Sequence, residues 1–531
     1  MKTPLLVTDF LKRARTAYRD APAAVCGNER LTYGHLGTRI DKFSNALATL
    51  GIKKGDVVAY LSFNCHRLLE GYYAVPQLGA ILLPINIRLT PPDIAFILND
   101  AGASTVVVDR QLVGLLAPIL ASLPAVKNVI LMGGDPKADL PVKGLDYEDL
   151  ITRAPADPPH VALDEDDVAE LFYTSGTTAR PKGVMLTHRN LVTHAYYSIA
   201  CAHVGDTDII LHSIPLFHVN GWGTPHTLTM VGGKHVMVPR FDPEHVLEVM
   251  EREHVTKMFV VPTMALALMN APSWRTRDLS ALKKVMFGGA ATPAAILRAL
   301  DERLPDAQVH CGYGLSETSP ILTTAVPKAH LHGDNASSLS ARLTAGLPIP
   351  GIEIEILDDD GKPLPHDGSS VGEVCARGNS IFAGYWKQPD ETKKSIVDGW
   401  LHTGDMGTID DQGYVAIVDR KKDIIITGGE NVASIEIEKA IYEHPAVLEC
   451  AVIGVPDEKW GEVPAAIIVL KPGQTLDVAE LIDHARVKLA HFKVPKHVKF
   501  MEALPKGGTG KILKRELREA YKKELQATPA R

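Results

Sequence analysis

Short apolar segments alternate with amphipathic segments over most of the chain. The apolar segments are rich in β-branched side chains, as buried strands are, and strands are therefore expected at 57–61, 105–108, 128–132, 169–173, 208–214 and 235–238. Asp242 and Pro243 combine a helix N-cap with a proline in the first turn. They predict a helix to about His254 and a returning strand at 257–261.

The same strand–helix–strand order recurs as a strand at 284–287, a helix at 292–304 and a strand at 307–310. Such crossovers join parallel strands, so the order predicts an α/β fold of parallel-rich sheets covered by helices. Smaller elements follow residue 420, in the order helix 435–442, strands 450–453 and 465–470, helix 477–490, strand 498–501 and a terminal helix from 512. We expect a large N-terminal domain, 1–419, and a small C-terminal α/β domain, 420–531.

Composition narrows the classes of function. The 531 residues are too many for one core, and the net charge of −7 argues against a dedicated nucleic-acid binder. The six cysteines are scattered without a Cys-x-x-Cys pair, which favours a reducing compartment over disulfides or a structural zinc. No secretory segment and no apolar stretch of transmembrane length is evident, so we expect a cytoplasmic protein. Peripheral membrane contact and a homodimer both stay open.

One loop has the chemistry of a polyphosphate site. The apolar run 169–173 leads into five small or hydroxylated residues, 174–178, which are followed by Arg180 and Lys182. Backbone N–H groups, hydroxyls and an ammonium in one loop are what a polyphosphate requires, although a surface turn is the ordinary alternative. No Gly-Lys-Ser/Thr closes the loop, so it is not a Walker A motif.

Five further segments follow in a fixed order, at 287–293, 313–318, 399–405, 424–432 and 505–512. With the loop at 174–182, they make the chain resemble the adenylate-forming superfamily of acyl-CoA synthetases, luciferases and peptide-synthetase adenylation domains. The resemblance extends over roughly residues 20 to 520. One departure is Ala179, where the family usually has glycine. If that position needs φ > 0, alanine costs about 1 kcal/mol, and we expect it to stiffen the loop without abolishing activity.

The resemblance implies roles for individual residues. Tyr313 would lie against adenine, Asp405 and Arg420 would bind the ribose, and Glu317 together with Thr177 would hold Mg²⁺. The whole ATP and AMP site would consist of Thr174, Ser175, Gly176, Thr177, Thr178, Lys182, Gly289, Ala290, Ala291, Gly312, Tyr313, Gly314, Ser316, Asp405 and Arg420.

The family also has a lysine that contacts the substrate carboxylate and the α-phosphate, and Lys511 lies at its position. An ammonium suits this role because both reactants are anions that repel each other. Lys422 takes the position of the hinge about which a mobile C-terminal domain rotates between two half-reactions. Gly428 and Gly429 would line the passage for the pantetheine arm of coenzyme A.

The acceptor is expected to be coenzyme A. Trp460, Phe492, Lys493 and Lys496 match places where CoA ligases contact CoA, and only 20 residues follow Lys511, which leaves no room for an attached carrier domain. Loading of a separate carrier protein, an oxygenase reaction like that of luciferases, and a non-catalytic nucleotide-binding module remain alternatives.

The segment 215–222 resembles the acyl-pocket entrance of fatty acyl-CoA synthetases. There the histidine, here His218, lines the carboxylate site with a catalytic role, and the tryptophan, here Trp222, gates an acyl tunnel. The remaining pocket residues would be Pro262, Thr263, Gly288, Gly289 and Gly312. No cationic residue is evident for a second carboxylate, so we expect an apolar monocarboxylic acid of medium or long chain. Aryl, short branched and sulfur-containing acids stay open.

Overall fold

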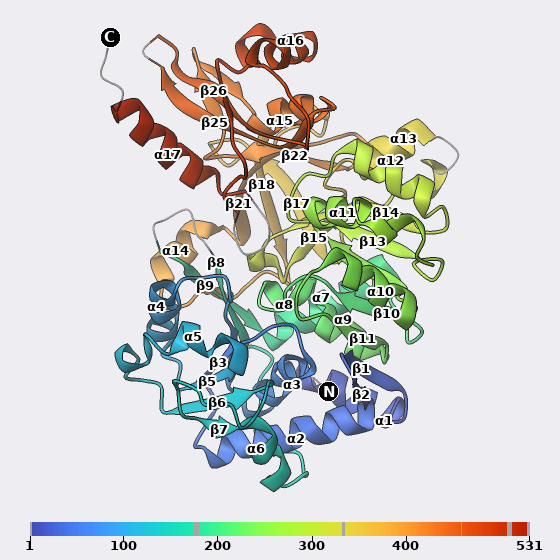
Figure 1. Cartoon of the computed structure of the whole chain (residues 1–531), viewed down its shortest axis with the longest axis vertical. Helices are drawn as coiled ribbons and strands as arrows, with labels where there is room; N and C mark the ends of the chain where they lie inside the picture. The colour runs from blue at the N-terminus through green and yellow to red at the C-terminus, as the bar shows by residue number, and fades with distance from the viewer. Residues whose placement is uncertain (1–2, 175–179, 332–334, 458, 507–511, 528–531) are drawn as a thin grey trace.

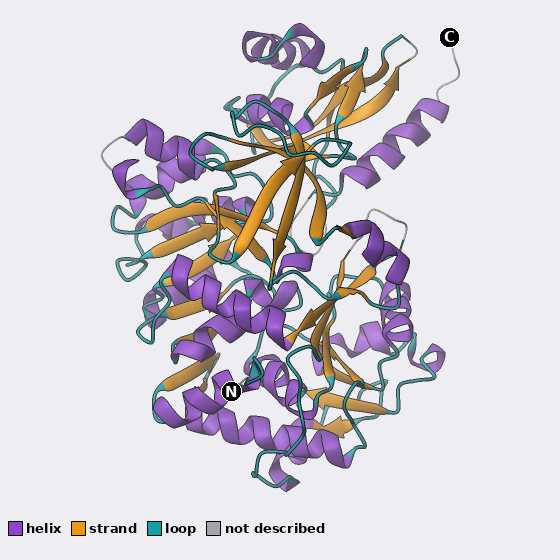
Figure 2. Ribbon diagram, turned by 180° about the vertical axis from the view of Figure 1, so that it is seen from behind, coloured by secondary structure: helices purple, strands orange, loops and turns teal. Residues whose placement is uncertain are grey.

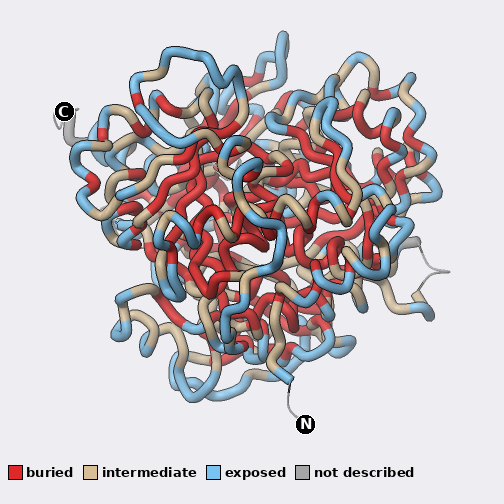
Figure 3. Tube along the Cα trace, turned by 90° about the horizontal axis from the view of Figure 1, so that it is seen from below, coloured by how far each residue is buried: buried red, intermediate tan, exposed pale blue. Residues whose placement is uncertain are grey.

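The structure is a computed structural model that describes residues 3–174, 180–331, 335–457, 459–506 and 512–527. Two large sheets and a smaller third sheet form the N-terminal part, and a fourth sheet carries the C-terminal domain (Figures 1 and 2). The predicted α/β class with a separate C-terminal domain is confirmed. Buried residues gather along the interior segments of the chain, and exposed residues lie on its periphery (Figure 3).

The first large sheet has the strand order β19-β9-β8-β4-β3-β5-β6-β7. Its inner pairs from β8 to β7 are parallel, and β8 pairs with β9 in antiparallel fashion. The strands are β3 (Val57–Leu61), β4 (Ile81–Pro84), β5 (Thr105–Asp109), β6 (Asn128–Met132), β7 (Leu145–Asp146), β8 (Val168–Thr174), β9 (Lys182–Thr187) and β19 (Gly384–Tyr385).

Strand β3 shows why these runs are apolar at every position. Val58 and Tyr60 pack into the core shared with the second sheet, whereas the alternate residues Val57, Ala59 and Leu61 pack under helices on the opposite face. Because successive side chains point to opposite faces, a strand buried on both sides needs no polar positions.

The second large sheet has nine strands in the order β16-β15-β14-β13-β12-β10-β11-β1-β2. The strands from β14 to β1 in this order are parallel. Their bounds are β1 (Pro22–Cys26), β2 (Glu29–Thr32), β10 (Ile209–His212), β11 (Lys234–Met237), β12 (Lys257–Val260), β13 (Lys284–Phe287), β14 (Gln308–Gly314), β15 (Ile321–Thr324) and β16 (Leu347–Pro348). Strand β10 ends two residues before the predicted end of its run.

Helices cover these sheets, and α10 begins as the sequence predicts. Asp242 accepts a hydrogen bond from the backbone N–H of His245 at 2.8 Å, Pro243 is the first helical residue, and His254 ends the helix in a left-handed conformation. The helices of this part are α1 (Thr8–Ala17), α2 (Tyr33–Thr49), α3 (His66–Ala74), α4 (Pro91–Ala101), α5 (Val113–Leu116), α6 (Tyr147–Arg153), α7 (His188–Ala202), α8 (Val219–Trp222), α9 (Thr224–Val231), α10 (Pro243–Glu253), α11 (Pro262–Met269), α12 (Ala294–Arg303), α13 (Asn335–Arg342) and α14 (Pro389–Ser395).

The third sheet lies between the large sheets and the C-terminal domain (Figure 1). It consists of β17 (Ile352–Leu357), β18 (Gly372–Gly378), β20 (Ile396–Val397), β21 (Trp400–Ile409) and β22 (Val415–Arg420). Its apolar residues pack against those of the second large sheet and form one shared core with them.

The C-terminal domain has two apolar clusters of its own, one on each face of its sheet. It comprises β23 (Ile425–Thr427), β24 (Glu430–Val432), α15 (Ser434–Tyr442), β25 (Val447–Asp457), β26 (Gly461–Leu470), α16 (Val478–Lys488), β27 (His497–Phe500) and α17 (Lys514–Ala527). Strands β25 and β26 extend well beyond the predicted runs because they pair continuously as a long antiparallel hairpin. Across the described ranges, no helix is both long and apolar enough to span a bilayer.

Candidate active site

The candidate phosphate loop joins β8 to β9, and Thr174 and Lys182 are the last cross-strand pair before it. The predictions for Ser175, Gly176, Thr177, Thr178 and Ala179 fall outside the described residues, as does the prediction for Lys511. The hairpin thus fixes where the loop leaves and re-enters the sheet.

Lys182 lies at the base of this loop with little exposure. Its Nζ is 2.6 Å from Oε2 of Glu391 in α14 and 5.0 Å from the ring centre of Tyr385 in β19. The hydrogen bond from the ammonium lowers the pKa of Glu391 to about 2. An ammonium that already holds one carboxylate at the edge of the loop is placed to bind another anion.

Tyr385 also connects this lysine to the candidate metal residue. Its hydroxyl donates a hydrogen bond to Oε1 of Glu317 at 2.8 Å, and β19 pairs with β9 through Val184. Burial raises the pKa of Glu317 above its usual value. Tyr385 is not among the predicted site residues, because a two-residue strand carries no periodic pattern.

Glu317 is chemically suited to Mg²⁺, since a hard cation prefers carboxylate oxygen. Across the described ranges, no group of three or more His, Cys, Asp or Glu side chains is arranged to hold a metal ion. A single carboxylate fits a Mg²⁺ ion that arrives with most of its ligands supplied by a nucleotide triphosphate and water.

The predicted ribose residues come together at the edge of the third sheet. Asp405 in β21 and Arg420 in β22 are cross-strand partners, with the Arg420 Nε 3.3 Å from Asp405 Oδ1. The Tyr313 hydroxyl donates to Asp405 Oδ2 at 2.6 Å, and burial together with this carboxylate raises the tyrosine pKa well above its usual value. Asp405 is only 4% exposed, so it presents a nearly dry carboxylate.

Two glycine-containing segments lie side by side next to this group. Strands β13 and β14 are parallel, with Phe287 opposite Cys311, so the turn 288–291, which follows β13, lies beside residues 312–314, which are the last residues of β14. A Cβ on Gly288 would lie 2.8 Å from Cη2 of Trp222. Gly288 therefore lets the indole lie directly against the backbone of the turn.

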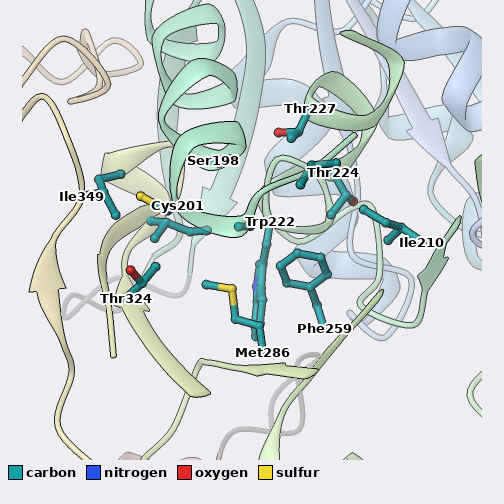
Figure 4. A pocket seen from close by; sticks show the side chains of 13 residues that line it. Ser198, Cys201, Ile210, Trp222, Thr224, Thr227, Phe259, Met286, Thr324 and Ile349 are labelled. Carbon is teal, nitrogen blue, oxygen red and sulfur yellow. The ribbon is translucent and has the colours of Figure 1, made fainter. Parts of the chain in front are cut away.

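Trp222 also borders an apolar pocket between the second large sheet and helices α7 to α9 (Figure 4). Its ring packs edge-on against Phe259, with the ring centres 6.2 Å apart. The lining residues are Ser198, Cys201, Ala202, Val204, Ile210, Trp222, Thr224, Thr227, Phe259, Met286, Ile321, Thr324 and Ile349. Of the predicted acyl-pocket residues, Trp222 lines this pocket. The others, His218, Pro262, Thr263, Gly288, Gly289 and Gly312, are not among its lining residues.

A buried network supports the turn that carries Trp222. Asn220 Nδ2 donates to Oε2 of Glu170 at 2.8 Å, the backbone N–H of Gly223 donates to Asn220 Oδ1 at 2.6 Å, and the other oxygen of Glu170 contacts Nε2 of His226. Glu170 lies in β8, so the strand before the phosphate loop also holds the pocket turn. Glu170 is not among the predicted site residues, although an acidic residue inside an apolar strand is a signal visible in the sequence.

The predicted hinge lies at the junction of the two domains. The Lys422 side chain is exposed, and desolvation at the junction together with the nearby Arg420 lowers its pKa. Lys514, three residues after Lys511, lies 2.7 Å from Glu438 and donates to the Ser434 hydroxyl at 2.6 Å. These contacts anchor the start of α17 on α15.

Part of the predicted CoA site is assembled in the C-terminal domain. The backbone N–H of Gly428 donates to the Trp460 carbonyl at 2.8 Å, and the Lys496 Nζ lies 4.8 Å from a ring centre of Trp460. A Cβ on Gly428 would approach the same indole to 2.8 Å. Lys493 Nζ lies 5.7 Å from the ring centre of Phe492 and binds Glu436 at 2.8 Å.

Gly429 adjoins this group with φ at 88°, and a Cβ there would meet no described atom within 4 Å. Trp460 and Phe492 are both about 40% exposed. The exposed aromatic rings with adjacent ammonium groups form a surface suited to a purine and its phosphates.

Comparison with known proteins adds independent information. Residues 11–386 match the family model described as AMP-binding enzyme, and residues 436–511 match its C-terminal domain. The chain is 38% identical to a long-chain-fatty-acid–CoA ligase of Thermus thermophilus, over 98% of this chain and 96% of that one. It is 37% identical to a feruloyl-CoA synthase of an Amycolatopsis species, over 96% and 98%.

A solved structure is similarly close in fold. The anthranilate CoA ligase in complex with anthranoyl-AMP superposes with a TM-score of 0.89 at 28% identity, covering 98% of both chains. The likeness extends through both domains rather than the nucleotide-binding part alone.

Proposed function

We propose a substrate and a mechanism for this chain from its family membership. The chain belongs to the AMP-binding enzyme family and is an acid–CoA ligase, with ATP and CoA as co-substrates. For this chain we propose a monocarboxylic acid with an apolar tail, of medium or long chain length. The observation that carries this choice is the pocket beside Trp222, in which no lining residue of the described chain bears a charge. A second carboxylate would be buried there without a partner, at a prohibitive cost.

In the first half-reaction, a carboxylate oxygen of the acid attacks the α-phosphorus of ATP, and pyrophosphate leaves as acyl-AMP forms. Lys182 would bind the phosphates, while Asp405 and Arg420 would bind the ribose hydroxyls in place of the hydrogen bond from Tyr313. Glu317, with Thr177, would hold the Mg²⁺ that neutralises phosphate charge. His218 would line the carboxylate site.

We propose that Lys511 contacts both the carboxylate of the acid and the α-phosphate of ATP, because an ammonium between the two anions offsets their repulsion. In the second half-reaction, the CoA thiol attacks the acyl carbonyl and AMP leaves. We place the domain boundary at 419/420 and propose that the C-terminal domain rotates about Lys422 between these steps. Gly428, Trp460 and Lys496 would then contact CoA.

An aryl acid is the second candidate. Trp222 and Phe259 meet edge to face in the pocket wall, an arrangement that accepts a third aromatic ring. The feruloyl-CoA synthase at 37% identity supports this candidate as well. Short branched and sulfur-containing acids, and transfer to a carrier protein, stay alternatives.

The chain contains six cysteines, and all six are free thiols. Free thiols persist in reducing compartments, which supports our placement of the protein in the cytoplasm. A homodimer stays a prediction.

A screen of acid-dependent pyrophosphate release tests the proposed function. The panel contains fatty acids of increasing length, aryl acids and short branched acids, each with and without free CoA. We expect pyrophosphate release with apolar acids and a thioester when CoA is added. Release with a carrier protein but no thioester with CoA would assign the alternative acceptor, and no release with any acid would refute ligase activity.

A further inference from the structure

The pocket beside Trp222 is mainly apolar, but some of its lining side chains carry polar groups. Five of its lining residues bear a hydroxyl or a thiol, namely Ser198, Cys201, Thr224, Thr227 and Thr324. A pocket that accepts only an alkyl chain has no use for such groups, because each buried polar atom needs a partner. Their hydrogen bonds therefore show which of them are available to a ligand.

Four of these groups are paired within the protein. Thr224 Oγ1 donates to the Gly221 carbonyl at 2.9 Å, and Ser198 Oγ lies 3.5 Å from the His194 ring nitrogens. The Thr324 hydroxyl lies near the Cys201 thiol and lowers its pKa against the effect of burial. These side chains are satisfied before any acid binds.

Thr227 is different. It is 3% exposed, and its Oγ1 has no hydrogen-bond partner in the described part of the chain. Thr227 lies in α9, which begins directly after the turn that carries Trp222. In Figure 4, Thr227 and Thr224 lie at one end of the pocket, while Met286 and Phe259 flank the indole toward the other end.

The location separates Thr227 from the candidate reaction centre. The tip of the Trp222 indole reaches the Gly288 turn, where the acyl-adenylate would form, whereas Thr227 lies toward the backbone end of this residue. An acid that enters past the indole therefore brings its tail, not its carboxylate, to Thr227.

We propose that Thr227 is a specificity-determining residue and that the preferred acid has an apolar body with an uncharged oxygen group, a hydroxyl or a carbonyl, on its tail. This inference rests on the proposed function. An alkyl tail would leave the Thr227 hydroxyl buried without a hydrogen-bond partner, whereas an oxygen on the tail would form a hydrogen bond with it.

The surroundings favour an uncharged group. The histidines that pair with pocket hydroxyls, His194 and His212, are buried, and burial lowers the pKa of each to about 3. They are neutral at physiological pH and supply no positive charge for an anionic tail.

The test compares matched acids on wild-type protein and Thr227→Val, which replaces the hydroxyl by a methyl of nearly the same shape. The pairs are phenylpropanoate with para-hydroxyphenylpropanoate, and hexanoate, heptanoate and octanoate with their ω-hydroxy derivatives. We expect wild type to prefer the oxygenated member of at least one pair by about ten-fold in kcat/KM, which corresponds to about 1.4 kcal/mol. In Thr227→Val this preference disappears, and kcat/KM for the alkyl members rises.

A matched control is Thr229→Val in the same helix. The Thr229 hydroxyl is 3.1 Å from Nε2 of His235, and Thr229 does not line the pocket. This variant loses thermal stability without a change in acid preference. Thr227→Val, which removes an unpartnered hydroxyl, keeps or raises the Tm of the free protein.

Two results with the variant would overturn the inference. One is a Thr227→Val variant in which kcat/KM changes by the same factor for both members of every pair. The other is a loss of Tm in Thr227→Val equal to that in Thr229→Val, which would mean that the hydroxyl is bonded within the protein. Adenylation of plain fatty acids by wild type with no oxygen preference would refute the inference alone and leave the proposed function standing, whereas no adenylation of any acid would refute both.

Discussion

The turn that carries Trp222 permits a sharp test at Asn220. Its five residues, from Val219 to Gly223, all have positive φ, at 41°, 43°, 55°, 65° and 80°. Left-handed backbone costs about 1–2 kcal/mol per non-glycine residue, so Val219, Asn220 and Trp222 together cost about 3–6 kcal/mol. Something in the surroundings must offset this strain.

The side chain of Asn220 supplies much of that compensation. Its bonds to Glu170 at 2.8 Å and from the Gly223 N–H at 2.6 Å contribute roughly 2–4 kcal/mol together. The strain and the restraint are therefore of similar size. Loss of the restraint should let the turn, and the indole of Trp222 with it, adopt other conformations.

We compare Asn220→Ala with Asn220→Gly. Both lose the two hydrogen bonds, but only alanine keeps the penalty for positive φ. After about 0.4–1 kcal/mol is subtracted for the greater unfolded-state freedom of glycine, the alanine variant should be less stable by about 1 kcal/mol. Urea unfolding followed by tryptophan fluorescence measures the difference. In both variants the KM for the acid should rise about ten-fold while the KM for ATP stays constant.

Two outcomes would contradict this reasoning. An alanine variant as stable as the glycine variant would mean that residue 220 is not held in the left-handed region. An equal rise of both KM values would mean that the turn serves the nucleotide site rather than the acid pocket.

Three further predictions follow from the site and the core. Lys511→Ala should abolish acid-dependent pyrophosphate release yet spare thioester formation from supplied acyl-AMP; equal loss of both steps would contradict its assignment. Gly288→Ala should displace the Trp222 indole and lower kcat/KM for the acid, with ATP binding, measured by calorimetry, unchanged. Burial lowers the pKa of four imidazoles to about 3, so these remain neutral in the folded protein while the unfolded chain takes up protons below about pH 6.5. The free energy of unfolding should therefore decrease as the pH falls below 6.5, by up to about 1.4 kcal/mol per imidazole and pH unit. The raised pKa values of Glu70 and Glu438 act in the opposite direction, because these carboxyls bind protons more readily in the folded protein. A Tm that is constant between pH 7.5 and 5.5 would refute this prediction of acid destabilisation. The four imidazoles are those of His66, His194, His212 and His310.

The elements themselves were largely encoded in local sequence. The cap at Asp242, the buried strand at 57–61 and the α/β order depend on neighbouring residues, and the structure confirms them. The motifs assign Tyr313 and Asp405 to one nucleotide, as its adenine and ribose residues, and in the structure their side chains share a hydrogen bond across 92 positions.

Tertiary structure alone decided the residues that link the motifs to one another. Tyr385 joins Lys182 to Glu317, and Glu170 holds the Trp222 turn, through contacts between strands and helices that are distant in the chain. Periodicity does not reveal the partners of such residues, even where an acidic residue interrupts an apolar strand as Glu170 does, since their function depends on which elements pack together. Thr227 is the clearest case: a threonine in a helix with two others is unremarkable in sequence, and only the packing around it leaves its hydroxyl buried at the pocket wall without a partner in the described chain.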